Sequence, residues 1–305
     1  MPRGLKFILV AMATLSCLIF AIDSGFGART ALRVPTPKLV DLRPGTFGYR
    51  VSGEFSRDGG PAMPPIVTIR IERTLSIMRG QVTAADYRRC VDAQACPTVD
   101  QDAAASDFPV VKTNWYDAIA YAEWLSRETG EHWRLPTDEE WVYAAAGLFK
   151  DDILPESFDG SDPGRRALAL YDRDASWTDT IEKALRPLGG FGENENGLLD
   201  IAGNVWEWTD TCFARHAFNG QGEVATTTVN CGVRVAEGRH RTYMTDFIRD
   251  PRIGGCAVGT PPANLGFRLV RDTNSWRGLR LLSSLAQRFF GGHVPAATSS
   301  ATKRT

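Results

Sequence analysis

The pattern of apolar and polar positions predicts one strand and three helices in the central part of the chain. Residues 66–74 alternate apolar and polar side chains, as a half-buried strand does. One helix is expected after Thr83, and a second runs from its N-cap Asn114 to Gly130, which ends it. The third begins at Thr137, where Glu140 stands at the capping-box spacing.

Outside these elements the chain is predicted to form loops. Residues 29–64 are rich in proline and glycine and predict a linker that leads into the domain. Residues 148–195 show no clear period and predict a long loop, whereas residues 266–272 predict a short closing strand. The pattern therefore predicts few helices and many loops in the central part of the chain.

Composition places the chain among ordinary globular proteins. It has 305 residues, of which 43% are hydrophobic and 23% charged, and its net charge is −1. Because this balance gives no strongly basic surface, nucleic acid is not an expected partner.

The two ends of the chain differ from its centre. Arg3 and Lys6 precede the uncharged apolar residues 7–22, so residues 1–28 are predicted to be an export signal, with a signal anchor as the alternative. In the tail, residues 273–305, a basic amphipathic helix is expected from Trp276 to Phe290, before a disordered end. This helix either lies on a membrane, docks on a partner or packs on its own domain.

The predicted export signal implies an oxidising environment, in which cysteines are expected to form disulfides. Cys90 and Cys96 close a short loop and are predicted to pair. Cys212 and Cys231 bracket a loop after a tryptophan-rich block and are predicted to pair next. Cys256 is left over as a buried inert residue, a reactive thiol or an intermolecular link, and it is also an alternative partner for Cys231.

The tryptophan-rich block, NGLLDIAGNVWEWTD at residues 196–210, concentrates oxygen donors around glycines. Side-chain oxygens at Asp200, Asn204 and Glu207, with Gly203 to let the backbone bend, suit a hard cation such as calcium. The alternative is a tight turn that is capped by Asx side chains and packed on the indoles.

Together with RLPTDEEWVYAAAG at 134–147 and NLGFRLVRD at 264–272, this block gives the chain three ordered motifs of a known family. The chain resembles the formylglycine-generating enzyme, or sulfatase-modifying factor, family over residues 65–272. The resemblance implies an irregular, loop-rich α+β fold of the C-type-lectin-like kind. It also implies a structural calcium site, with side-chain oxygens from Asp200 and Glu207 and backbone carbonyls from Gly203 and Val205.

The resemblance also implies chemistry whose ligands this chain lacks. The family's best-known enzyme oxidises a substrate cysteine with copper held by two cysteines, and those positions fall on Thr245 and Asp250 here. No cysteine occurs from Gly232 to Gly255. Other relatives hold iron with three histidines, and the four histidines of this chain show no such spacing. Neither a copper nor an iron site is therefore expected.

Residues 238–244, GRHRTYM, stand where the family has a glycine-rich block that faces its substrate cleft. Arg239 and Arg241 flank His240, so the cluster either binds an anionic group, with His240 as acid or base, or is a solvated surface. These three residues and Cys256 are the candidate catalytic residues.

These observations favour an exported, periplasmic accessory or maturation factor that holds a partner polypeptide in the family's cleft, without cysteine oxidation. The residues around His240 also resemble accessory proteins of copper nitrite reductases, which would imply a role in denitrification. One alternative is an active periplasmic oxidoreductase, of the formylglycine-generating or pyoverdine-maturation type, with a non-standard metal site. Another is a ligand-binding, lectin-like module, because a fold by itself does not fix a function.

Overall fold

The computed structural model describes residues 34–101, 106–149, 164–165, 168–169, 172, 185–238, 240–249 and 264–272. The predicted export signal, the tail helix, Arg239 and Cys256 lie outside the described residues. Residues up to Pro35 form a unit separate from the one that begins at Thr36, and the fold below belongs to the second. The described part of the chain contains no helix that is long and apolar enough to span a membrane.

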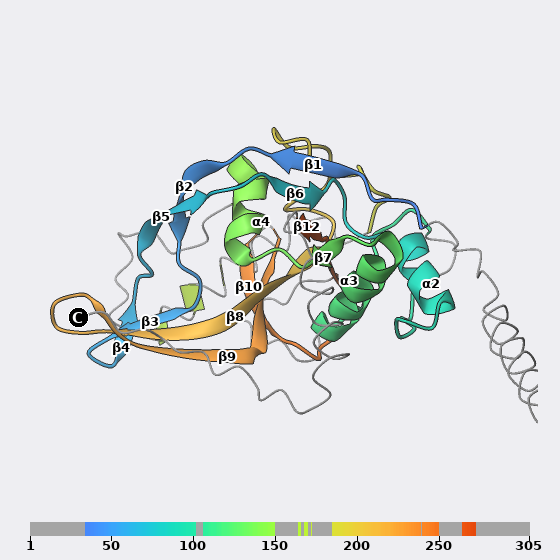
Figure 1. Ribbon diagram of the computed structural model, residues 1–305. Helices are drawn as coiled ribbons and strands as arrows, with labels where there is room; N and C mark the ends of the chain where they lie inside the picture. Colours follow the sequence, from blue (N-terminus) through green and yellow to red (C-terminus); the bar gives the residue numbers. More distant parts are fainter. Residues whose placement is uncertain are drawn as a thin grey trace, which may run out of the picture. The chain divides into compact units, whose positions relative to one another are not determined.

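Strands from distant parts of the chain form three sheets (Figure 1). The strands are β1 Leu39–Leu42, β2 Gly45–Arg50, β3 Glu54–Arg57, β4 Gly60–Ala62, β5 Ile66–Ile71, β6 Leu75–Met78, β7 His132–Arg134, β8 Trp206–Phe218, β9 Val224–Glu237, β10 Arg241–Thr245, β11 Leu265–Gly266 and β12 Val270–Asp272. A four-stranded sheet has the order β1-β6-β12-β7, and β2 pairs with β5. A six-stranded sheet runs β10-β9-β8-β3-β4, with β11 beside β8.

The helices begin where the sequence places their caps. They are α2 Ala84–Asp92, α3 Trp115–Thr129 and α4 Asp138–Ala145, which the 3-10 turn η1 Ala146–Leu148 follows. Thr83 caps α2, whereas Asn114 and Thr137 form capping boxes at the starts of α3 and α4. Gly130 ends α3 in the left-handed conformation, with φ of 71°. The three predicted helices and the predicted strand at β5 are confirmed.

Residues 29–64 are not the linker that the sequence predicted, because β1 to β4 lie within them. β1 pairs with β6 and β2 pairs with β5, both antiparallel, and β3 runs parallel to β8. Pro44, Gly53 and Gly59 lie at turns between these short strands, whereas other glycines and one proline lie within β2 and β4. The strands are stabilised by partners far along the chain, which a local pattern does not reveal.

The predicted loop between Cys212 and Cys231 is instead a long hairpin. β8 and β9 continue through both cysteines, and the turn at residues 219–223 joins them. In Figure 1 this hairpin extends away from α2 and α3. The predicted closing strand at 266–272 is divided, since β11 pairs with β8 and β12 lies between β6 and β7.

The main hydrophobic core lies between the four-stranded sheet and α4. Leu42 and Ile77 from the sheet meet Trp141 of α4, Leu198 of the tryptophan-rich block and Val270 of β12. Burial of these side chains is the chief stabilising contribution here, at about 1.5–3 kcal/mol for each large one. The architecture is α+β and loop-rich, as predicted.

Candidate functional site

Within the tryptophan-rich block, Glu207 is completely buried, with an exposed fraction of 0%. Arg268 donates two hydrogen bonds to this carboxylate, from Nε to Oε2 at 2.6 Å and from Nη2 to Oε1 at 2.8 Å. Trp141 Nε1 donates to Oε2 at 2.9 Å, and Gln81 Nε2 donates to Oε1 at 2.8 Å. Each carboxylate oxygen therefore accepts two hydrogen bonds, so the buried charge is fully satisfied.

Arg268 is equally buried and connects three segments of backbone. Its Nη1 donates to the carbonyls of Met78 and Arg79 at 3.2 Å, and its Nη2 donates to the carbonyl of Leu199 at 3.0 Å. One guanidinium and one carboxylate balance each other in charge. This pair therefore fastens β6, the block and β8 together from inside.

Asp200 uses its carboxylate to organise the loop before it. Its Oδ2 accepts the N–H of Gly189 at 2.6 Å and its Oδ1 accepts the N–H of Phe191 at 2.7 Å. Asp200 and Asn204 both have left-handed backbone, with φ of 53° and 64°. The carboxylate of Asp200 therefore holds the preceding loop at residues 189–191 against the block, and does not cap a turn of its own.

Three of the four predicted calcium ligands, Asp200, Gly203 and Glu207, have a hydrogen-bond donor beside the predicted oxygen, and the calcium site stays a prediction. Gln81 Nε2 lies 3.2 Å from the carbonyl oxygen of Asp200, 3.3 Å from that of Gly203 and 2.8 Å from Glu207 Oε1. Amide hydrogens thus face the oxygens that would surround a cation, and the charge opposite Glu207 is already supplied by Arg268. Gln81 and Arg268 therefore donate hydrogen bonds to oxygens of the expected metal site.

Arg241 lies in a second buried cluster, which contains two carboxylates. Its Nε donates to Glu237 Oε1 at 2.8 Å, and its Nη2 donates to Asp138 Oδ1 at 3.2 Å. The hydroxyl of Tyr49 donates to Asp138 Oδ2 at 2.5 Å. β2, α4, β9 and β10 therefore meet at a single guanidinium.

The two carboxyl groups of this cluster titrate in opposite directions. Burial, and then the charge of Asp138, raise the pKa of Glu237 well above its usual range. Burial also acts to raise the pKa of Asp138, but Arg241 and the hydrogen bonds from Glu237 and Tyr49 outweigh it and lower that pKa. Glu237 Oε2 is buried and has no hydrogen-bond partner among the described residues, so a negative charge on that oxygen is not stabilised by a donor.

The predicted cluster around His240 does not form an anion-binding pocket among the described residues. His240 is buried, its Nδ1 lies 3.0 Å from the carbonyl oxygen of Arg241, and its ring meets Trp206 edge to face at 5.3 Å. Trp206 Nε1 donates to the carbonyl of His240 at 3.1 Å. His240 is therefore not a solvated histidine, and the Arg241 side chain is only 7% exposed. Arg239 lies outside the described residues, so the role predicted for the whole cluster stays a prediction.

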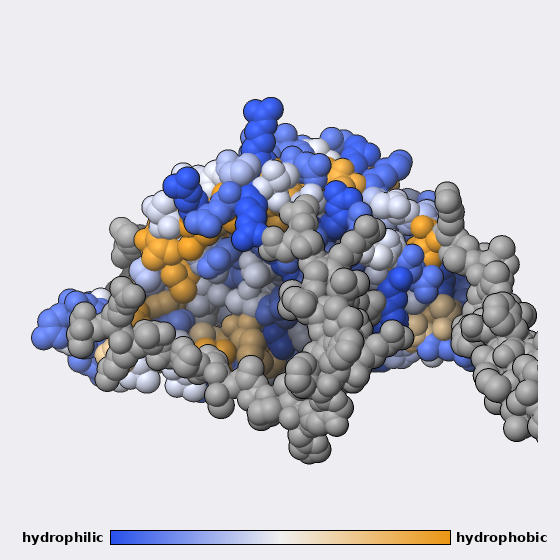
Figure 2. All heavy atoms as spheres, in the orientation of Figure 1, coloured by the Kyte–Doolittle hydropathy of each residue, from blue (hydrophilic) through white to orange (hydrophobic). Residues whose placement is uncertain are grey.

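A pocket of about 440 Å³ opens beside α4 and the β2–β5 pair. Its lining includes Phe47, Arg50, Ile66, Tyr143 and Phe149, and none of the predicted site residues is part of it. Figure 2 shows hydrophobic side chains gathered at the surface over β2 and β5, where Ile66 is 61% exposed. Sequence reasoning missed this pocket because one of its walls, β2, lies within the expected linker, opposite residues of α4.

A family profile and individual similar proteins identify the same family. Residues 27–273 match the profile of the sulfatase-modifying factor enzyme 1-like domain. The formylglycine-generating enzyme of Bos taurus is 30% identical over 182 residues, which are 54% of this chain and 44% of that protein. The inactive C-alpha-formylglycine-generating enzyme 2 of Bos taurus is 37% identical over 106 residues, 34% of this chain and 33% of that protein. The matches thus span less than half the length of either relative.

Among solved structures, PvdO from Pseudomonas aeruginosa aligns with 77% of this chain and 94% of its own, at 22% identity and a TM-score of 0.48.

Proposed function

Because this chain belongs to the sulfatase-modifying factor family, we propose that it is an exported accessory or maturation factor for a partner polypeptide, without the family's copper-dependent oxidation of cysteine. The two disulfides indicate an oxidising, extracytoplasmic location. Calcium is common in the family, but the proposed role does not use it.

The observation that carries the proposal is the residue at the first thiol position. By resemblance this position falls on Thr245, which lies at the end of β10, opposite Val233 of β9. A shift in the alignment does not supply thiols, because no cysteine occurs from Gly232 to Gly255. Soft thiolates are the natural ligands of Cu(I), and a threonine hydroxyl does not replace one.

Two further observations support retention of the scaffold for binding. The buried ion pair between Glu207 and Arg268 is formed, and the helices α3 and α4 both begin with capping boxes. One matched relative is itself named an inactive formylglycine-generating enzyme. A family scaffold without that activity is therefore a reasonable expectation for this chain.

The chemical half of the proposal is tested with the purified chain, Cu(I), dioxygen and a sulfatase-type cysteine peptide. We expect the mass of the peptide to stay unchanged, with no aldehyde. Conversion of the cysteine to formylglycine at more than about 1% per hour would overturn the proposal and favour the active oxidoreductase instead.

The binding half is tested by photo-crosslinking in cells that export the protein. A photoreactive residue replaces Phe247, which is 64% exposed near the end of β10, and a matched control replaces Ile66, which is 61% exposed on β5. We expect one discrete protein adduct from position 247 and none of that mass from position 66. Equal patterns from both positions would contradict a specific partner.

A further inference from the structure

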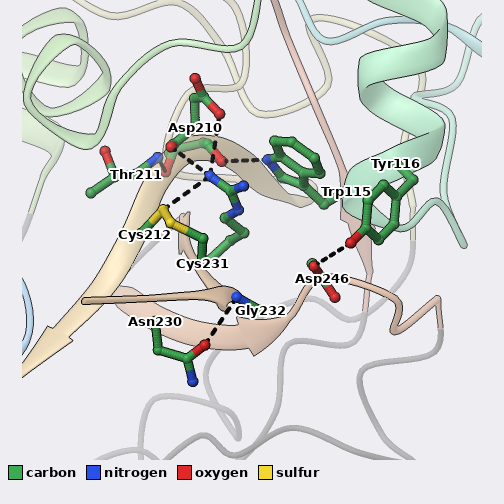
Figure 3. The surroundings of a disulfide bond; sticks show 11 residues. Trp115, Tyr116, Asp210, Thr211, Cys212, Asn230, Cys231, Gly232 and Asp246 are labelled. Atoms are coloured by element: carbon green, nitrogen blue, oxygen red, sulfur yellow. Dashed lines mark hydrogen bonds and ion pairs between the residues drawn. A yellow bond between two sulfur atoms is a disulfide. The ribbon is translucent and has the colours of Figure 1, made fainter. Parts of the chain in front are cut away.

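The two described disulfides differ in exposure, and Cys212–Cys231 is the accessible one. Cys212 on β8 is half-buried, whereas Cys231 on β9 is exposed. Their Cα atoms lie 4.5 Å apart on neighbouring strands. Figure 3 shows the sulfur–sulfur bond with Asp210 and Thr211 nearby. A sulfur atom at the surface can be attacked by another thiolate, while a buried one cannot.

A bulge in β9 brings Cys231 to the surface. Cys212 pairs with Arg234 across the hairpin and Phe213 pairs with Asn230, so residues 231–233 have no opposite residue on β8. The N–H of Gly232 donates to Asn230 Oδ1 at 3.0 Å within the bulge (Figure 3). The exposed sulfur is thus held on a defined backbone rather than on a long loop.

A fixed cation stands beside the other sulfur. Arg234 Nη1 lies 3.3 Å from Cys212 Sγ, and the guanidinium carbon lies 3.9 Å from the ring centroid of Trp115. The same Nη1 donates to the backbone carbonyl of Asp210 at 2.9 Å and lies 3.3 Å from its Oδ1. Arg234 is therefore placed to stabilise negative charge on Cys212, with the Asp210 carboxylate as a partial counter-charge.

The strand that carries Cys231 has an unpaired edge among the described residues. β10 covers only Val233 to Glu237 of β9, and Asp246 donates to the carbonyl of Gly232, so from Val224 to Asn230 the only described neighbouring strand is β8. The sequence VATTTVN at 224–230 is β-branched and uncharged, without the lysine or proline that usually protects such an edge. Free backbone N–H and C=O groups of this kind accept an added strand.

Exposed aromatic side chains flank the same place. Tyr116 is 53% exposed and its hydroxyl donates to Asp246 Oδ2 at 2.7 Å (Figure 3). The N–H of Asp246 donates to the carbonyl of Gly232 at 3.1 Å, which sets the turn with Phe247 beside the bulge. An apolar surface next to an open strand edge suits a polypeptide better than a small thiol.

We propose that Cys212–Cys231 is a thiol–disulfide exchange site for a cysteine-containing polypeptide that docks as an extended strand on the free edge of β9. The inference rests on the proposed function, since it names the surface and the chemistry by which a partner is held. An added strand lies on the side of β9 opposite β8. Its cysteine sulfur therefore approaches Cys231 Sγ roughly in line with the bond to Cys212.

The exchange step is balanced without any further reagent. The thiolate of the polypeptide attacks Cys231 Sγ and forms a new disulfide with it, after its proton has passed to water. The Cys212–Cys231 bond breaks, and its electron pair stays on Cys212 Sγ as a thiolate. Arg234 donates a hydrogen bond to that thiolate, which makes Cys212 the better leaving group of the two.

The test mixes the purified, fully oxidised chain with a blocked β-branched peptide of about ten residues that contains one cysteine. Acid-quenched samples are analysed by intact mass and by peptide mapping. We expect a mixed disulfide on Cys231 that forms at least about 10-fold faster than with glutathione at equal thiolate concentration. Cys90–Cys96 stays intact as an internal control.

Two changes separate docking from leaving-group stabilisation. N-methylation of alternate peptide bonds should reduce the rate to that of glutathione, because it removes the strand hydrogen bonds. Arg234→Met should slow the exchange about 10-fold, whereas Arg215→Met, an exposed position on the same hairpin, should not. Attachment at Cys212, equal rates for peptide and glutathione, or no effect of Arg234→Met would overturn the inference.

A serine version of the peptide distinguishes this failure from that of the proposed function. If it binds the chain but the cysteine peptide does not exchange, the exchange site is disproved and partner binding stands. If neither peptide engages the chain and the crosslink from position 247 is also absent, both proposals fail.

Discussion

Two buried ionic clusters lie close to the centre of this fold, and they differ in the ratio of acids to bases. Glu207 and Arg268 form a one-to-one pair in which every carboxylate oxygen has two donors. Arg241 instead serves both Asp138 and Glu237. In the first cluster the charges balance and each carboxylate oxygen has its donors, whereas in the second, burial and the neighbouring Asp138 raise the pKa of Glu237.

The difference shows that a buried acid in this family scaffold is not by itself a metal or catalytic signal. What Glu207 can bind is decided by Arg268 and Gln81, which already use its oxygens. What Glu237 does is decided by the neighbour with which it shares one base. Substitutions in each cluster test this difference.

Arg268→Met should have the largest effect, because it leaves Glu207 charged, buried and without its main partner. We expect a loss of about 3–5 kcal/mol in the free energy of unfolding, or failure to fold. Denaturant unfolding followed by tryptophan fluorescence measures it. Arg271→Met, whose partner Glu131 is partly exposed, is the matched control and should cost less than about 1 kcal/mol.

The double variant Arg268→Met with Glu207→Leu decides how this loss arises. If the unpaired charge is the cause, removal of Glu207 should recover part of the stability. No recovery would mean that the hydrogen bonds from Arg268 to three backbone carbonyls matter more than its charge.

Asp138→Asn should have a smaller effect, of about 1–3 kcal/mol. The change removes the anion beside Arg241, and Glu237 can then ionise in its place. The pKa of Glu237 should therefore fall, and the variant should lose the pH dependence that the raised pKa causes. A full loss of structure would show that the two carboxyl groups cannot substitute for each other.

Glu237→Gln should raise stability at alkaline pH by roughly 1–2 kcal/mol. The folded protein keeps a proton on Glu237 that the unfolded chain releases above its ordinary pKa. Wild-type stability therefore falls as pH rises from that value through the raised pKa, and glutamine has no such loss. Asp138 acts in the opposite sense, since its lowered pKa gives stability above its unfolded value that is lost as pH falls.

The measurement is a series of denaturant titrations from pH 4 to 9 on both proteins. The two stability curves should converge near the unfolded pKa of glutamate, about 4.3, and separate above it. Parallel curves across the range would show that Glu237 is ionised in the fold.

Chelation should have the smallest effect. Because Gln81 and Arg268 occupy the oxygens of the expected site, EDTA should shift the melting temperature by less than about 1 °C, as should millimolar calcium. Thermal unfolding with and without each reagent tests this. A decrease of more than about 5 °C in EDTA would show that Gln81 gives way to a cation.

Local signals in the sequence were sufficient to predict where the helices begin. Asn114 and Thr137 each satisfy N–H groups within their own first turn, so four neighbouring residues determine where the helix starts. Strand β3 has a local partner, β4, across the Asp58–Gly59 turn, and this hairpin signal was overlooked. Its second partner, β8, lies about 160 residues further along, which no local pattern reveals. The hairpin at Cys212 was missed because its outer half is exposed on both faces and shows no apolar alternation.

The motif correctly indicated that two acids lie close together, and the calcium ion assigned to them stays a prediction. Asp200 and Glu207 are oxygen donors in any context, and the sequence shows only that they are close together. Their hydrogen-bond donors come from Gln81, in a segment with no motif of its own, and from Arg268 in the closing motif. A pairing of the arginine in one motif with the acid in another was the signal that could have revealed the clamp.

The short segment at residues 264–272 joins both large sheets, with β11 in one, β12 in the other and Arg268 between them. A ribosome makes this segment after all other described strands, so neither sheet nor the interior clamp is complete until it has emerged. Removal of these nine residues would therefore take one strand from each sheet and the arginine of the buried pair in a single step.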